Sequence, residues 1–207
     1  MDGKPWRVWL RVGLGVVFVG LVVAFVLGLI VEAVILLATV AACSASLIPL
    51  FVDQAPTVSG VFLRRHAATG KLCLLATLRA DGFPRISPIE PRVFEDRLTL
   101  VGMPGTTKFA DLQRDPRFNL HTATVDPQLA DGDAKLWGRA RHLPDPELHA
   151  RFADDLFAEI GLDLRGQVFD PFFVADLTGA SSIEMRDGQL FITIWHPGRG
   201  ERTVRKR

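Results

Sequence analysis

The stretch from Leu72 to Ala123, LCLLATLRADGFPRISPIEPRVFEDRLTLVGMPGTTKFADLQRDPRFNLHTA, decides the fold. Short apolar runs alternate with turn signals such as Arg79-Ala-Asp-Gly82, where the glycine suits the positive φ of a hairpin turn. The pattern predicts strands over 72–78, 84–89, 97–102 and 118–123, a turn region over 92–96, and a helix over 109–114 stopped by Asp115-Pro116.

The centre of this stretch, Gly102-Met-Pro-Gly-Thr-Thr-Lys108, has the parts of an anion-binding site. Two glycines and a proline shape a turn, Thr106 and Thr107 offer hydroxyls, and Lys108 offers a positive charge. The first backbone N–H groups of the following helix would point at the same place. The sequence therefore predicts that a phosphate group binds here.

The strand over 84–89 contributes a second set of candidate residues. Alternation places three residues on one face and three on the other, namely Arg85, Ser87 and Ile89 against Ile86, Pro88 and Glu90. Arg85 offers a forked set of donors to phosphate oxygens, whereas a lysine acts as a point charge. The alternative is that Arg85 and Ser87 are ordinary surface residues and that the threonine and lysine are a simple helix cap.

Composition excludes several classes of function. The chain has 207 residues and a formal net charge of +1, which gives no reason to expect nucleic-acid binding. The two cysteines, Cys43 and Cys73, lie in very different segments, so no disulfide framework is expected. The five histidines are scattered without metal-ligand spacing, so no metal site is predicted.

The stretch from Val8 to Val52 differs from the rest because it is almost entirely apolar. Trp9–Val31 is long enough for a membrane helix, which needs about 20 apolar residues, and Val34–Val52 is nearly so. Glu32 between them favours a turn, because a carboxylate is costly inside a bilayer. We predict a helical membrane hairpin over 1–52, a linker over 53–60 and a soluble domain over 61–207. Basic residues at both ends of the hairpin predict that the soluble domain faces the cytoplasm.

Two alternatives to this hairpin stay open. Val40-Ala-Ala-Cys43 is similar to a lipoprotein lipobox, although the apolar region before it is longer than a signal peptide core. The second alternative is that the segment is an extension of the gene model and does not belong to the working protein. In that case we expect the domain to be cytoplasmic.

The rest of the soluble domain continues the strand-rich pattern. We predict helices over 58–69 and 145–160, the second opened by Asp145-Pro-Glu147 and closed by Gly161. Further strands are predicted over 134–143, 172–177, 182–186 and 189–196, followed by a basic tail over 199–207. His121 and Trp137 are either pocket residues or core residues. Many antiparallel strands with few helices predict a mainly β fold, a β-barrel with α additions.

The order and spacing of these motifs resemble the pyridoxamine 5'-phosphate oxidase-like family of flavin-binding split β-barrels. The resemblance rests on Ala76–Pro88 with its Asp-Gly-x-Pro turn, on Arg97–Lys108, and on Leu112-Gln-Arg-Asp-Pro-Arg-Phe118. Gly138-Arg-Ala140 and Trp195-His-Pro-Gly198 extend it over nearly all of 58–207.

The resemblance implies a fold, a cofactor and a site. It implies a split β-barrel and a homodimer with FMN, or the deazaflavin coenzyme F-420, at the subunit interface. The implied cofactor-binding residues are those of the strand, the turn and the helix start: Arg85, Ile86, Ser87, Pro88, Val101, Gly102, Thr106, Thr107 and Lys108. The flavin would perform hydride transfer, and no obligatory catalytic side chain is assigned.

The sequence also departs from the family pattern. Glu90 stands where the true vitamin oxidases carry a lysine, and the chain contains no tyrosine. Its end, Arg202-Thr-Val-Arg-Lys-Arg207, lacks their closing Arg-Leu-x-Pro. We therefore expect an oxidoreductase for another small substrate. The alternative is a non-enzymatic flavin- or haem-binding module at the membrane.

Overall fold

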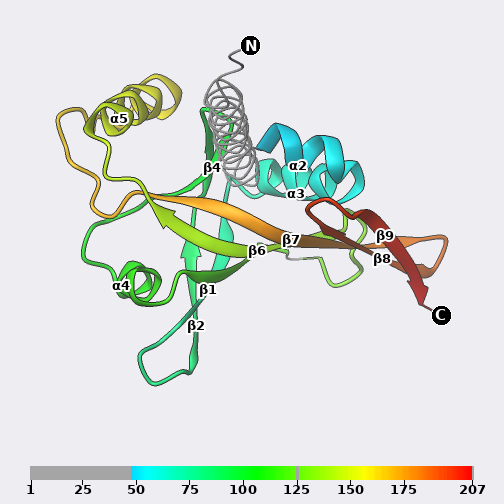
Figure 1. The fold of residues 1–207 in the computed structure, drawn as a ribbon. Helices are drawn as coiled ribbons and strands as arrows, with labels where there is room; N and C mark the ends of the chain where they lie inside the picture. The colour runs from blue at the N-terminus through cyan, green and yellow to red at the C-terminus, as the bar shows by residue number, and fades with distance from the viewer. Residues whose placement is uncertain (1–47, 125, 207) are drawn as a thin grey trace, which may run out of the picture. The chain divides into compact units, whose positions relative to one another are not determined.

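The computed structural model describes residues 48–124 and 126–206, and Ser44–Arg207 forms one compact unit (Figure 1). The helices are α2 (Ile48–Gln54), α3 (Pro56–Ala68), α4 (Thr107–Arg114) and α5 (Pro146–Ile160). The strands are β1 (Cys73–Leu78), β2 (Pro84–Ile89), β3 (Arg92–Phe94), β4 (Arg97–Leu100), β5 (Arg117–Thr122), β6 (Asp133–His142), β7 (Phe173–Arg186), β8 (Gln189–His196) and β9 (Gly200–Lys206). The described part of the chain is therefore mainly β, as predicted.

The strands form one antiparallel sheet whose order is β2-β1-β5-β6-β7-β4-β3, with β8 on β7 and β9 on β8. The long strand β7 makes this possible because its two halves have different partners. Phe173 and Val174 at its start pair with β4, while Ala180 to Arg186 pair with β8. β6 pairs along almost the whole of β7, so these two strands form the centre of the sheet (Figure 1).

The continuity of β7 corrects the prediction of two strands over 172–177 and 182–186. Gly138 of β6 pairs with Leu177, and Trp137 pairs with Gly179, so Thr178 is an extra residue on β7. Such a β-bulge bends a strand without ending it. Residues 178–181, which were left out of both predicted strands, therefore belong to β7.

Two strands were missed in the sequence. β3 lies in the predicted turn region over 92–96, where Glu95 and Asp96 alone form the turn and both have positive φ angles. β9 lies in the predicted basic tail and pairs with β8 from Gly200 to Lys206. Both strands are at the edge of the sheet, where charged residues are common.

The predicted linker over 53–60 is also wrong, because these residues lie mainly in α2 and α3. Ile48 and Phe51 of α2 are buried in the core of the sheet, and the Phe51 ring contacts Trp195 at 5.1 Å between centroids. The end of the predicted second membrane span, 48–52, therefore packs on the protein domain. The remainder of the predicted hairpin lies outside the described residues. Within 48–124 and 126–206, no helix is long and apolar enough to cross a bilayer.

The buried side chains form two clusters. The larger contains the inner residues of the sheet, such as Leu75, Leu120 and Leu136, together with apolar residues of α2, α3 and α4. The smaller joins α5 to the other end of the sheet, and its members are Phe94, Leu148, Phe152, Ala153, Leu156, Phe169, Phe172 and Val174. α5 thus lies apart from α2 and α3, near β3 and β4 (Figure 1).

Candidate functional site

The turn before α4 is shaped by its glycines. Gly105 has a φ of +72°, which favours glycine, and a Cβ on Gly102 would lie 3.3 Å from the ring of Phe109. Thr106 then takes the extended conformation of an N-cap residue, but its side chain makes no capping hydrogen bond. Its hydroxyl oxygen is buried and has no partner among the described residues. Buried hydroxyls are normally paired, so this start of α4 has an unused polar group.

Lys108 lies in the first turn of α4 and reaches the neighbouring strand. Its Nζ donates a hydrogen bond to the carbonyl oxygen of Pro88 at 2.8 Å. Burial lowers the pKa of the Lys108 ammonium, because a charged group loses hydration there. The acceptor is neutral, and no ion pair to Lys108 occurs within the described residues. The ammonium is therefore available to an anion.

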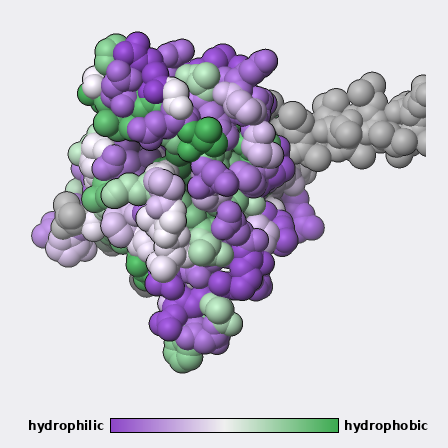
Figure 2. Space-filling view, turned by 90° about the vertical axis from the view of Figure 1, so that its left-hand side faces the viewer, coloured by the Kyte–Doolittle hydropathy of each residue, from purple (hydrophilic) through white to green (hydrophobic). Residues whose placement is uncertain are grey.

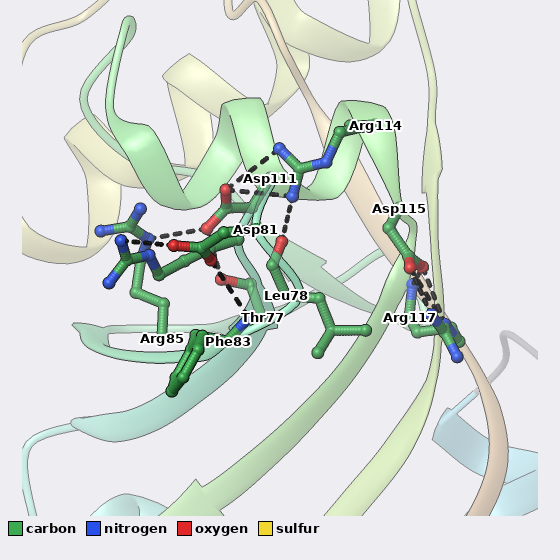
Figure 3. Close-up of polar contacts among 10 residues, drawn as sticks. Thr77, Leu78, Asp81, Phe83, Arg85, Asp111, Arg114, Asp115 and Arg117 are labelled. Carbon is green, nitrogen blue, oxygen red and sulfur yellow. Dashed lines mark hydrogen bonds and ion pairs between the residues drawn. The ribbon is translucent and has the colours of Figure 1, made fainter.

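Arg85 contacts the same helix one turn further on (Figure 3). Its Nε donates to Asp111 Oδ2 at 2.7 Å, and the Thr77 hydroxyl donates to the same oxygen at 2.9 Å. Arg114 approaches the other oxygen of Asp111 at 3.3 Å. Burial alone would raise the pKa of Asp111, but the hydrogen bonds from Arg85, Thr77 and Arg114 together hold it below its usual range.

The guanidinium of Arg85 is only partly used by this network. Figure 3 shows its terminal nitrogens pointing away from Asp111, and they have no hydrogen-bond partner in the part of the chain that the structure describes. Its side chain remains 30% exposed, whereas that of Asp111 is 5% exposed. Arg85 is thus fixed in position by one edge and keeps donors for another group.

A cavity of about 600 Å³ lies beside Lys108. Of the residues predicted to bind a cofactor, Pro88, Val101, Gly102 and Lys108 line it. The remaining candidates do not belong to its wall: Arg85, Ile86, Ser87, Thr106 and Thr107. The structure therefore brings the strand and the helix start together, but only part of the set shares one cavity, and Arg85 and Ser87 of the predicted face are not in its wall. The cofactor role of all these residues stays a prediction.

The opposite wall of the cavity was not predicted. It is formed by α5 and the following segment, and includes Phe152, Leu156, Ile160, Leu162 and Leu164. The sequence indicated that α5 is a helix, but nothing in its pattern indicates which part of the sheet it covers. The segment after Gly161 has no regular structure and gave no signal.

His121 and Trp137 do not line this cavity. His121 lies 3.2 Å from a carboxylate oxygen of Asp133, and this hydrogen bond raises the pKa of the imidazole. Trp137 packs over Gly179, where a Cβ would lie 2.5 Å from the indole, and its ring contacts His196. Both residues therefore have structural partners on the sheet.

Neither a metal site nor a reactive thiol is found among the described residues. Residues 48–124 and 126–206 contain no group of His, Cys, Asp or Glu side chains that could hold a metal ion. Cys73 is buried, and burial raises the pKa of its thiol to about 12. The start of α4 and the adjoining cavity are the best candidate site.

The antiparallel sheet and this helix start define the class of the protein, the split β-barrels related to pyridoxamine 5'-phosphate oxidase. A family model described as "Pyridoxamine 5'-phosphate oxidase" matches residues 64–181. Because the match covers more than half of the 207 residues, the chain belongs to the pyridoxamine 5'-phosphate oxidase family.

Solved structures with a similar fold include proteins of different function. A pyridoxamine 5'-phosphate oxidase-related, FMN-binding protein from Nostoc punctiforme has a TM-score of 0.51 and 12% identity, over 73% of this chain and 95% of that chain. PhzG from Burkholderia lata 383, in complex with tetrahydrophenazine-1-carboxylic acid, has a TM-score of 0.47 and 15% identity, over 76% of this chain and 96% of that chain. A haem-binding protein from Mycobacterium smegmatis has a TM-score of 0.45 and 22% identity, over 68% of this chain and 55% of that chain. A search of curated proteins found no match. At 12% identity the likeness to the Nostoc punctiforme protein shows the fold alone.

Proposed function

We propose that this protein binds FMN and acts as a flavin-dependent oxidoreductase on a small molecule. The observation that carries the proposal is the start of α4, where the buried Thr106 hydroxyl has no partner and the Lys108 ammonium has only a neutral acceptor. A phosphate group fits this donor set because it accepts hydrogen bonds from hydroxyl, ammonium and backbone N–H groups together. Membership of the family supports the same cofactor.

The residues have separate tasks in this proposal. Thr106, Thr107 and Lys108 hold the phosphate, and the free terminal nitrogens of Arg85 supply a second cation. Asp111 keeps the Arg85 side chain in place through its hydrogen bond to Nε. Pro88, Val101 and Gly102, which line the cavity beside Lys108, pack against the ring system.

The bound flavin supplies the hydride chemistry, and this chain's residues supply position and shielding. The apolar wall formed by α5 excludes water from the cavity next to the proposed ring site. The substrate then occupies the rest of this cavity. No side chain of the cavity needs to exchange a proton in this account.

We further propose a homodimer and a membrane location. On the outer face of the β1–β2 pair, Ile86 is 70% exposed and Leu74 is 39% exposed, with Pro88 opposite Leu74 in the register. Exposed apolar residues on a sheet favour burial against a second copy of the chain. The N-terminal segment would anchor the domain on the cytoplasmic side of a membrane.

The test is a titration of the full chain with FMN, coenzyme F-420 and haem, followed by absorbance, fluorescence and photoreduction. The proposal predicts a stable complex with FMN whose visible absorbance bleaches on reduction and returns with an electron acceptor. Tighter binding of F-420 would assign the deazaflavin instead. A Soret band with haem and no flavin binding would contradict the proposal.

A further inference from the structure

The wall of the cavity opposite Lys108 is strongly apolar. Leu156 of α5 and Phe169 of the following segment are buried members of the second core cluster, and both line the cavity. Ile160, Leu162 and Val168 line it from the same side and are 52%, 46% and 76% exposed. Figure 2, which views the molecule from the side of α4 and α5, shows hydrophobic surface among hydrophilic regions on this face. Apolar side chains left open around one cavity indicate a ligand that covers them.

The cations of the wall have partners, whereas its carboxylates have no permanent cation beside them. Arg92 forms an ion pair with Glu159 of α5. Under the proposed function, Lys108 is occupied by the phosphate of the cofactor. Glu90 has no ion pair among the described residues, and Asp170 lies 3.6 Å from His142, which is a cation only when protonated. Both carboxylates would repel an anion.

α5, which supplies part of this wall, is attached to neighbouring residues along its length. Near its end, Glu159 accepts hydrogen bonds from both Lys71 and Arg92. Near its start, Arg151 donates to Glu95 at 2.6 Å. Between these points Phe152 packs edge-on against Phe94, with 5.3 Å between ring centroids.

From these observations we infer that the substrate is a predominantly apolar small molecule without a negative charge, bound between Leu156, Leu162 and Val168 on one side and the turn before Lys108 on the other. This inference rests on the proposed function, because it assigns Lys108 to the cofactor. In the proposed function the flavin ring shares the cavity of about 600 Å³, so the substrate is a small molecule that fills the space left beside that ring. Its recognition is by shape and desolvation, and not by a salt bridge.

The experiment measures displacement of the uncharged dye Nile red from the full chain saturated with FMN. The competitors are methyl 2-naphthoate and 2-naphthoate, which have the same rings and differ in charge. We expect the ester to displace half of the dye at a concentration at least about 10-fold lower than the carboxylate requires. Equal or stronger displacement by the anion would overturn the inference.

Variants locate the dye. Leu162→Asp places a charge in the wall, so Nile red affinity falls at least about 10-fold, and the milder Leu162→Asn lowers it less. Val93→Asp is the matched control, since Val93 is 42% exposed and does not line the cavity. Unchanged dye affinity in both Leu162 variants contradicts the site. FMN affinity is measured in parallel. If the native chain does not bind FMN, the proposed function is refuted. If the native chain binds FMN but not the dye, only this inference is refuted.

Discussion

Lys108 Nζ and the carbonyl oxygen of Pro88 lie 2.8 Å apart, and both residues line the cavity. One turn along α4, Asp111 makes the corresponding contact with Arg85 of the same strand. Helix α4 is therefore fixed to β2 at two points. Because only the second point is an ion pair, a cation is left at the start of the helix where an anion is easily held.

Replacement of Asp111 tests the structural half of this arrangement. Asp111→Ala leaves Arg85, Thr77 and Arg114 without their shared acceptor, in a place where Asp111 is only 3% exposed. We expect a loss of about 2–3 kcal/mol in the free energy of unfolding, measured with urea. The control is Asp81→Ala, which removes an exposed pair with Arg79 and an exposed hydrogen bond from the Phe83 backbone N–H, and should cost about 1 kcal/mol. Equal effects of the two substitutions would contradict the network.

The same carboxylate predicts a pH dependence. Its pKa is lower in the folded state than the unfolded value of about 3.9, so between these two values the folded state binds fewer protons than the unfolded state does. The stabilisation is therefore complete well above pH 4 and is lost as the pH falls through the folded pKa. In urea unfolding, the difference between the native chain and Asp111→Asn should shrink from pH 7 to about pH 3. A difference that stays constant over this range contradicts the assignment.

Replacement by alanine should have opposite effects on stability at two glycines, Gly138 beside the bulge of the central strand pair and Gly60 in α3. A Cβ on Gly138 would lie 2.0 Å from the backbone oxygen of Asp176, so Gly138→Ala should cost at least about 2 kcal/mol. Gly60 lies inside α3, and a Cβ added there would have no heavy atom within 4 Å, so Gly60→Ala should stabilise by about 0.5–1 kcal/mol. Thermal unfolding of both variants measures the difference in sign. A stable Gly138→Ala variant would show that the strands are arranged differently.

Cys73 should not react with thiol reagents in the folded chain. It is fully buried, and burial raises the pKa of its thiol to about 12, so little thiolate forms at neutral pH. In a Cys43→Ser background, a thiol reagent should react with Cys73 only at the rate at which the chain unfolds, and fast after urea is added. Rapid reaction without denaturant would contradict the burial of β1.

The regular elements of the domain were predictable because their patterns are local. The alternation over β2 and the Asp145-Pro-Glu147 start of α5 depend on neighbouring residues, and both elements occur where expected. The merged strand β7 was not predictable, because the bulge at Thr178 depends on Trp137 of another strand. Likewise, the apolar residues of α2 suit either a membrane or a core, and only the tertiary contact with Trp195 decides between them.

The site shows the same division. The motif around Lys108 could be found in the sequence because its glycines, threonines and lysine are close together in the chain. Its partner wall could not, since Leu156 and Leu162 reach the cavity only through the packing of α5 on Phe94 and Phe172. The contact of Arg85 with Asp111 was also hidden, because an arginine on a strand gives no sign of which carboxylate it meets.

The most direct test compares FMN with riboflavin, which lacks the phosphate, by fluorescence titration of the native chain, Lys108→Ala and the exposed-lysine control Lys206→Ala. The native chain and the control should bind FMN more tightly than riboflavin. Lys108→Ala should lose about 10- to 100-fold in FMN affinity while riboflavin affinity stays nearly constant. If the native chain binds the two flavins equally, or if Lys108→Ala binds FMN as tightly as the control, then Lys108 does not hold a phosphate and the proposed cofactor site is wrong.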